Sequence, residues 1–167
     1  MNGGRLRAAV CGIMIRLRLA GETMSGLPSI RRAVAADAPR LAELLGQLGY
    51  PTDAASAAAR LTRLLADSST AVFVACRDSD VCGLATVQSH VALNRDAPSV
   101  QLTLLVVADG LRGSGVGRAL VSAAEDWTRR HGAGRLVVTT AAHRAGAHAF
   151  YERLGYAVTG RRYAREL

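Results

Sequence analysis

The sequence contains no lysine, so all 21 of its basic residues are arginines, opposed by 13 acidic residues for a net charge of +8. Together with abundant alanine, this usage is typical of a GC-rich genome. Aromatic residues make up only 4% of the chain. The arginines are scattered, unlike the aromatic-lined basic surfaces that bind single-stranded nucleic acid. We therefore expect no nucleic acid as a partner, whereas a small phosphate-rich ligand fits the charge.

Cysteine is scarce, with Cys11, Cys76 and Cys82 as the three examples and no C-x-x-C pair among them. This odd number favours neither a disulfide framework nor a zinc site, so we expect no metal. Cys76 and Cys82 lie in apolar segments, where free thiols act as small buried hydrophobic side chains. Free thiols suit the reducing cytosol, and a cytoplasmic location is expected.

No stretch of the sequence approaches the roughly 20 apolar residues that a membrane span needs, so no membrane association is expected. Half of the 167 residues are hydrophobic, which is enough for one domain with its own core. Residues 1–28 differ from the rest in their short, arginine-flanked apolar patches. We expect an N-terminal extension that is either loosely ordered or lies ahead of a true start near Met24.

A regular pattern of elements begins at residue 29. Apolar runs bounded by turn residues predict strands, and leucines at helical spacing predict helices. The expected strands are 30–34, 71–76, 81–88, 100–107, 135–140 and 156–163, and the expected helices are 37–48, 53–66, 115–131 and 145–154. This order indicates a single α/β domain with a mixed sheet flanked by helices.

A glycine-rich segment follows the most apolar of the predicted strands. Residues 106–120 read VVADGLRGSGVGRAL, in which a strand ends and three alternating glycines open a helix. The first turn of a helix has N–H groups without partners and a partial positive charge, a geometry that holds phosphate. Glycines let the backbone approach a pyrophosphate, and Arg112 and Arg118 can add charge-assisted contacts.

Two common phosphate loops do not match this segment. A P-loop needs a lysine and a hydroxyl residue after its last glycine, but Gly117 is followed by Arg118 and Ala119. A dinucleotide fingerprint needs G-x-G-x-x-G after the first strand and an acidic residue further on. Here the spacing is G-x-G-x-G, and the next strand ends in Thr139 and Thr140.

A third pattern does match. Residues 112–117, RGSGVG, fit the signature [QR]-x-x-G-x-[GA] of the GNAT superfamily of N-acetyltransferases, and residues 150–156, FYERLGY, resemble its F-Y-x-x-x-G-[FY] segment. One departure is Asp109, where the family usually carries proline. The resemblance extends from residue 29 to the C-terminus. It implies a GNAT-like splayed sheet and an acetyl-CoA-dependent N-acetyltransferase domain over residues 29–167.

This resemblance places acetyl-CoA in a cleft between the strands 100–107 and 135–140. The pantetheine arm would pair with the first of these strands, and the pyrophosphate would lie on the amides of the glycine loop. The N–H of Val107 would stabilise the oxyanion that develops on the thioester. The implied acetyl-CoA-binding residues are Leu105, Val106, Val107, Arg112, Gly113, Ser114, Gly115, Val116, Gly117 and Arg118.

Tyr151 matches the family's usual general acid, which would meet the leaving thiolate. A phenol with a pKa near 10 is a weaker acid than a thiol near 8.5, so full proton transfer is uphill by about 2 kcal/mol. A hydrogen bond that strengthens as charge develops is one alternative. A tyrosine that only packs is another.

The general base is left open by the sequence. Thr103 stands where many relatives carry glutamate, with Gln101 two residues earlier, and neither can act as a base. An alkylamine has a pKa near 10.4, so only roughly one in two thousand is neutral at pH 7. Ordered water, His90 or His143 could take the proton, although an ordinary surface role is the alternative for both histidines.

Residues 144–151, RAGAHAFY, resemble the family's R-x-x-A-H-x-F-Y variant, which is common among acetyltransferases of small-molecule amines. His148 shares a helix face with Tyr151, which it either orients or packs near. A small-molecule amine is thus the expected acceptor. A protein lysine or N-terminus, or a non-catalytic acyl-CoA-binding module, are the alternatives.

The acceptor side is expected to involve the segments 50–55 and 91–98, in which Asp53 and Asp96 are the acidic residues. An acidic pocket there would favour a cationic acceptor, but these two residues are too few to decide. Because relatives are often dimers, the resemblance also implies a homodimer.

Overall fold

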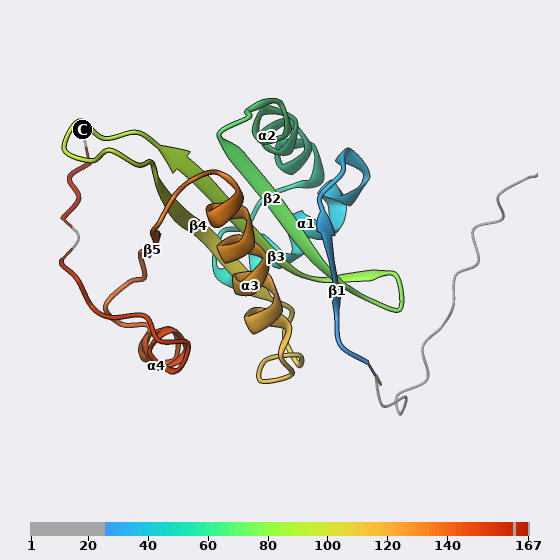
Figure 1. The fold of residues 1–167 in the computed structure, drawn as a ribbon. Helices are drawn as coiled ribbons and strands as arrows, with labels where there is room; N and C mark the ends of the chain where they lie inside the picture. The colour runs from blue at the N-terminus through green and yellow to red at the C-terminus, as the bar shows by residue number, and fades with distance from the viewer. Residues whose placement is uncertain (1–25, 162, 167) are drawn as a thin grey trace, which may run out of the picture.

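The computed structural model describes residues 26–161 and 163–166. Cys11, Met24 and most of the predicted N-terminal extension lie outside these described residues. The elements are β1 (Ser29–Arg32), the 3-10 turn η1 (Ala35–Asp37), α1 (Ala38–Leu48), α2 (Ala54–Ala66), β2 (Thr70–Arg77), β3 (Asp80–His90), β4 (Ser99–Val107), α3 (Val116–Arg130), β5 (Leu136–Val138) and α4 (Ala145–Arg153) (Figure 1).

The strands form one open, mixed sheet in the order β1-β2-β3-β4-β5. Neighbouring strands from β1 to β4 are antiparallel, whereas β4 and β5 are parallel. Helices α1 and α2 cover one face of the sheet and α3 covers the other (Figure 1). The predicted α/β fold with a mixed sheet flanked by helices is therefore confirmed.

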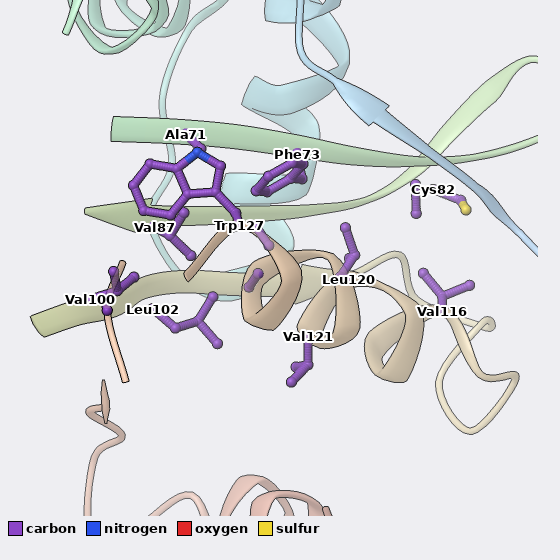
Figure 2. Packing of buried hydrophobic residues seen from close by; sticks show 14 residues of the cluster. Ala71, Phe73, Cys82, Val87, Val100, Leu102, Val116, Leu120, Val121 and Trp127 are labelled. Atoms are coloured by element: carbon purple, nitrogen blue, oxygen red, sulfur yellow. The ribbon is translucent and has the colours of Figure 1, made fainter. Parts of the chain in front are cut away.

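Alternation along the strands divides the core into two layers. In β2, Phe73 and Ala75 point toward α3, while Val72 and Val74 point toward α1 and α2. Figure 2 shows the layer on the α3 side, where Trp127 and its neighbours from that helix lie over the sheet. Burial of each large apolar side chain in these layers contributes about 1.5–3 kcal/mol.

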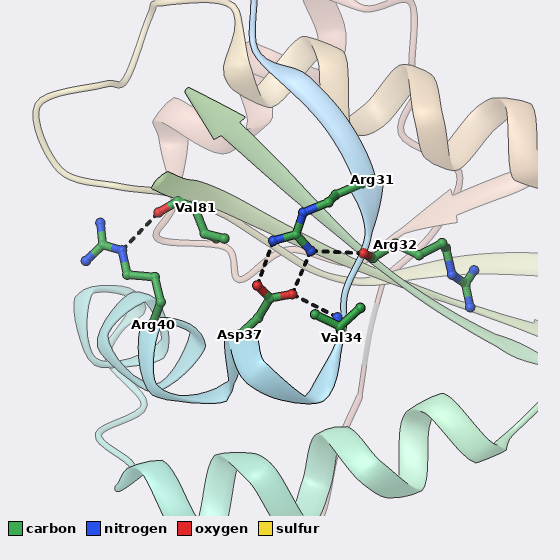
Figure 3. Close-up of polar contacts among 6 residues, drawn as sticks. All are labelled: Arg31, Arg32, Val34, Asp37, Arg40 and Val81. Carbon is green, nitrogen blue, oxygen red and sulfur yellow. Dashed lines mark hydrogen bonds and ion pairs between the residues drawn. The ribbon is translucent and has the colours of Figure 1, made fainter. Parts of the chain in front are cut away.

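The junction between β1 and α1 is held by a buried carboxylate (Figure 3). Asp37 is 7% exposed and accepts hydrogen bonds from both terminal nitrogens of Arg31, at 2.8 and 2.7 Å, and from the N–H of Val34 at 2.8 Å. The hydrogen bonds from Arg31 hold the pKa of Asp37 below its usual value. Arg40 of α1 donates to the carbonyl of Val81 at 2.9 Å. Helix α1 is thereby fixed to the sheet.

The two cysteines within the described residues are buried free thiols, as predicted for Cys76 and Cys82. Burial raises the pKa of the Cys82 thiol. Among the described helices, none has the length and apolar character required to cross a membrane.

The prediction of a last strand over residues 156–163 is wrong. The described residues of this segment form no strand, and the sheet ends at β5. β5 itself is limited to Leu136–Val138 and offers only a short edge for pairing. Val158 and Tyr163 are each 86% exposed, so these two side chains of the predicted strand cover no core.

Candidate functional site

The sheet opens between β4 and β5. β5 pairs with β4 only at Val100–Leu102, although β4 continues to Val107. Across the described residues, the β5-facing edge of β4 has no strand from 103 to 107, so backbone groups there are available to a ligand. A bulge marks the opening, because Thr86 pairs with Leu104 and Val87 with Leu102, which leaves Thr103 as the extra residue.

A cleft of about 470 Å³ lies at this opening. Its walls come from α1 and α2 on one side, from the splayed part of β4 below, and from the end of β5 and the start of α4 on the other side. Thr103, Leu104 and Leu105 of β4 line it, together with Tyr151 of α4. The structure thus brings the predicted catalytic tyrosine to the strand predicted to hold pantetheine.

The glycine loop connects β4 to the first turn of α3. Gly113 and Gly115 have φ values of +81° and +87°, a region that other residues adopt only with strain. Gly115 is the N-cap residue of α3 and lacks a capping side chain. The N–H groups of the first turn are therefore open to an anion.

Gly117 is constrained differently from the other two loop glycines. A Cβ at this position would lie 3.3 Å from the Phe150 ring and 3.6 Å from a methyl group of Val107. Helix α4 therefore approaches α3 closely at this point. Because Tyr151 follows Phe150, this close approach also fixes the position of the tyrosine relative to the loop.

Tyr151 is half-buried, and its ring contacts those of Phe150 and Tyr156 at centroid distances of 5.1 and 5.7 Å. Burial raises the pKa of Tyr151 to about 12, so the phenol keeps its proton and can donate it in a hydrogen bond. The hydroxyl of Tyr156 donates to Oε1 of Glu125 at 2.9 Å, which ties the end of α4 to α3.

The family model for GNAT acetyltransferases matches residues 38–156, which include the splayed strand, the glycine loop and Tyr151. The chain belongs to the GNAT acetyltransferase family. It is an N-acetyltransferase of a family that takes its acetyl group from acetyl-CoA.

Relatives of this GNAT acetyltransferase include enzymes named for antibiotics. It is 36% identical over 142 residues to the aminoglycoside N(6')-acetyltransferase type 1 of Stenotrophomonas maltophilia, covering 83% of this chain and 92% of the relative. It is 40% identical over 97 residues to the streptothricin acetyltransferase of Streptomyces lavendulae, and this match covers 57% of this chain and 48% of the relative.

A solved structure also shares the fold of the acetyltransferase. AAC(6')-Iy, in complex with the bisubstrate analogue CoA-S-monomethyl-acetylneamine, superposes with a TM-score of 0.76 at 21% identity. The match covers 85% of this chain and 99% of that chain.

The departure from the family pattern at Asp109 has a structural use in this acetyltransferase. The backbone N–H of Asp109 donates to Oε1 of Gln47 at 3.0 Å, which joins the end of β4 to α1. Proline could not make this bond. The Asp109 carboxylate also lies 3.0 Å from Arg112, and both side chains are well exposed.

Arg77 contacts the glycine loop, a contact that the sequence did not predict. At the end of β2, its NH2 group donates to the carbonyl of Ser114 in the glycine loop at 2.9 Å. Its Nε is buried and has no hydrogen-bond partner among the described residues. No local pattern could have found Arg77, because its partner lies 37 residues further along the chain.

We expect Arg77→Met to weaken acetyl-CoA binding about tenfold, because a charge-assisted hydrogen bond that holds the loop is lost. Calorimetric titration would measure the dissociation constant, and Arg77→Lys should recover part of the affinity. Arg95→Met, in the exposed loop at the other end of the sheet, is the matched control. An unchanged dissociation constant in Arg77→Met would contradict this role.

Of the predicted alternatives for a general base, neither histidine lines the cleft. His90 and His143 are exposed and do not line it. Nε2 of His148 lies 3.1 Å from the carbonyl oxygen of Ala141 and braces the connection between β5 and α4. Thr103 bonds to Thr86, and Gln101 donates to Thr139 at 3.3 Å.

The predicted acceptor segments contribute less than expected. Of residues 50–55, Tyr50 lines the cleft, whereas Asp53 accepts a hydrogen bond from the N–H of Ser56 and caps α2. No residue of 91–98 lines the cleft, Asp96 included. Within the described part of the chain, the cleft is therefore lined by neither a carboxylate nor a histidine.

Proposed function

We propose that this GNAT enzyme is cytoplasmic and transfers the acetyl group of acetyl-CoA to the amine of a small molecule, with Tyr151 as its catalytic residue. The observation that carries the proposal is the opening between β4 and β5, where Tyr151 lines a cleft together with Thr103 and Leu105 of the splayed strand. The proposed acetyl-CoA site comprises Leu105, Val106, Val107, Arg112, Gly113, Ser114, Gly115, Val116, Gly117 and Arg118.

The residues present fit acetyl-CoA. The unpaired edge of β4 can hydrogen-bond an amide-bearing arm, and the first turn of α3 offers free N–H groups for a pyrophosphate. The left-handed backbone at Gly113 and Gly115 exposes the loop amides without side chains in the way. Arg112 and Arg118 are exposed near this loop and can add positive charge.

When bound, acetyl-CoA supplies a thioester whose C–S bond breaks as a new N–C bond forms, while the amine gives up a proton and the sulfur gains one. The N–H of Val107 is proposed to stabilise negative charge on the carbonyl oxygen. Tyr151 is proposed to donate a hydrogen bond to the departing sulfur, since its raised pKa favours stabilisation over full proton transfer.

Proton removal from the amine is proposed to occur through water or by selection of the neutral amine. The support is the absence of a carboxylate or histidine lining the cleft across the described residues. An amine with a pKa of about 8 is neutral in roughly one molecule in ten at pH 7, against roughly one in two thousand for an alkylamine. Weakly basic amines are thus favoured.

A small acceptor is supported by the cleft and by the relatives. A volume of about 470 Å³ falls in the range of sites that enclose small molecules. The relatives from Stenotrophomonas maltophilia and Streptomyces lavendulae are both named for small-molecule antibiotics. We also propose that residues 29–167 form the catalytic domain and that the enzyme is a homodimer.

Thermal unfolding in the presence of acetyl-CoA tests this proposal, with ATP and NAD as controls. Ligand at 100 times its dissociation constant should stabilise the protein by about 2.7 kcal/mol, and only acetyl-CoA should do so. Thiol release in the presence of a panel of amines would then identify acceptors. Folded protein that acetyl-CoA does not stabilise would overturn the proposed site.

A further inference from the structure

One wall of the cleft is apolar and comes from α1 and α2. Leu45 and Leu48 of α1 and Leu64 of α2 are half-buried and line the cleft, while Leu41 and Leu61 lie beneath them as part of the core. These side chains are on the α1–α2 side of the sheet, and no residue of the glycine-rich segment 106–120 lines the cleft with them. This wall can therefore contact the acceptor rather than the phosphates of acetyl-CoA.

The charged groups that line the cleft are both arginines, within the described residues. Arg60 of α2 is exposed, and its guanidinium makes no hydrogen bond or ion pair within the described residues. Arg144 precedes α4, and its NH2 group donates to the carbonyl of Leu48 at 3.3 Å, so it spans from α4 to α1. A guanidinium group binds carboxylate and phosphate oxygens through paired N–H donors.

We propose that the acceptor is an amine that carries an apolar body and an oxyanion group, either a carboxylate or a phosphonate. This inference rests on the proposed function, because it assigns the acceptor class of the same cleft. The apolar body would contact Leu45, Leu48 and Leu64, and the oxyanion would pair with Arg60 or Arg144.

The two arginines that line the cleft disfavour a polycationic acceptor. Arginine and a cationic acceptor group repel each other in a partly desolvated site, and no carboxylate lines the cleft across the described residues to offset this repulsion. Asp53, the acidic residue that starts the α2 wall, is engaged with the N–H and hydroxyl of Ser56. This acetyltransferase thus differs from what the names of its antibiotic-modifying relatives would suggest.

The first test compares matched acceptors with the full-length enzyme. Phenylalanine, its phosphonate analogue and phenylalaninamide share one apolar body, and neamine represents the polycations. The same three forms would be prepared with leucine and tryptophan bodies. Thiol release is measured at saturating acetyl-CoA, and kcat/KM is expressed per neutral amine because the amides are less basic. We expect the carboxylate or phosphonate forms to exceed the amides and neamine by about tenfold or more.

The second test uses the arginines themselves. Arg60→Gln and Arg144→Gln should raise KM for the best anionic acceptor about tenfold in at least one variant, with KM for acetyl-CoA unchanged. Arg60→Glu and Arg144→Glu should reduce the preference for anions over amides further. Arg63→Gln is the control, because Arg63 lies on α2 near Arg60 but does not line the cleft.

The outcomes separate this inference from the proposed function. Faster acetylation of neamine or of the amides would overturn the acceptor class and leave small-molecule acetylation standing. A raised KM for acetyl-CoA in both glutamine variants, with acceptor KM unchanged, would assign the arginines to acetyl-CoA and overturn the inference. No thiol release with any amine would overturn the proposed function together with it. Comparing the carboxylate acceptors with the phosphonate acceptors shows which of the two oxyanion groups the enzyme prefers.

Discussion

We expect Tyr151→Phe to lower kcat by about 100-fold and to leave the dissociation constant for acetyl-CoA unchanged. The substitution removes only the hydroxyl of a side chain that lines the cleft, and the ring keeps its contacts with Phe150 and Tyr156. The departing sulfur then lacks a hydrogen-bond donor. Steady-state kinetics and calorimetric titration measure the two quantities separately.

The control for this substitution is Tyr163→Phe, because Tyr163 is 86% exposed and does not line the cleft. An unchanged kcat in Tyr151→Phe would show that the hydroxyl has no role in catalysis and that the tyrosine only packs.

The pH profile adds a second readout for Tyr151. Burial raises its pKa to about 12, so the hydroxyl stays protonated below that value and the wild-type rate should have no falling limb up to about pH 10. The rising limb should follow the pKa of the acceptor amine. In Tyr151→Phe the profile should keep this shape at a lower rate.

Gly115→Val should abolish measurable acetyl-CoA binding, with a loss of at least about 100-fold in affinity. Gly115 has φ +87°, where a β-branched residue is strained by about 1–3 kcal/mol. The strain can be relieved only by moving the backbone that presents the N–H groups of α3. Calorimetric titration with acetyl-CoA measures the loss, and thermal unfolding shows that the variant is folded.

Gly132→Val is the matched control for the glycine loop. Gly132 also has a left-handed backbone, with φ +68°, but it follows the other end of α3. A comparable loss of stability with normal acetyl-CoA affinity is expected there. Retained binding in Gly115→Val would show that the loop does not hold the pyrophosphate.

Features that depend on neighbouring residues could be predicted from the sequence. β2, β3 and β4 follow from alternating or continuous apolar runs, and α3 begins one residue after its predicted start at Gly115. The position of Tyr151 on a helix that follows the glycine loop also came from local patterns. Such features are local because strand and helix periods are set within a few residues.

Features that depend on distant residues could not be predicted in this way. Residues 156–163 have the composition of a strand, but a strand also needs a partner edge, and the sheet ends at the short β5. Arg77 meets Ser114 only because β2 ends beside the loop. Both outcomes depend on how segments far apart in the chain are arranged.

The sequence by itself determined the family, the fold class, the glycine loop and the tyrosine, because each is carried by residues close together in the chain. Tertiary structure alone decided which side chains line the cleft. It placed Arg60, Arg144 and three half-buried leucines at the cleft and left Asp53, Asp96, His90 and His143 off its walls. The physical reason is that the lining of a cleft is set by the packing of α1, α2 and α4 around an opened sheet, which no local pattern encodes.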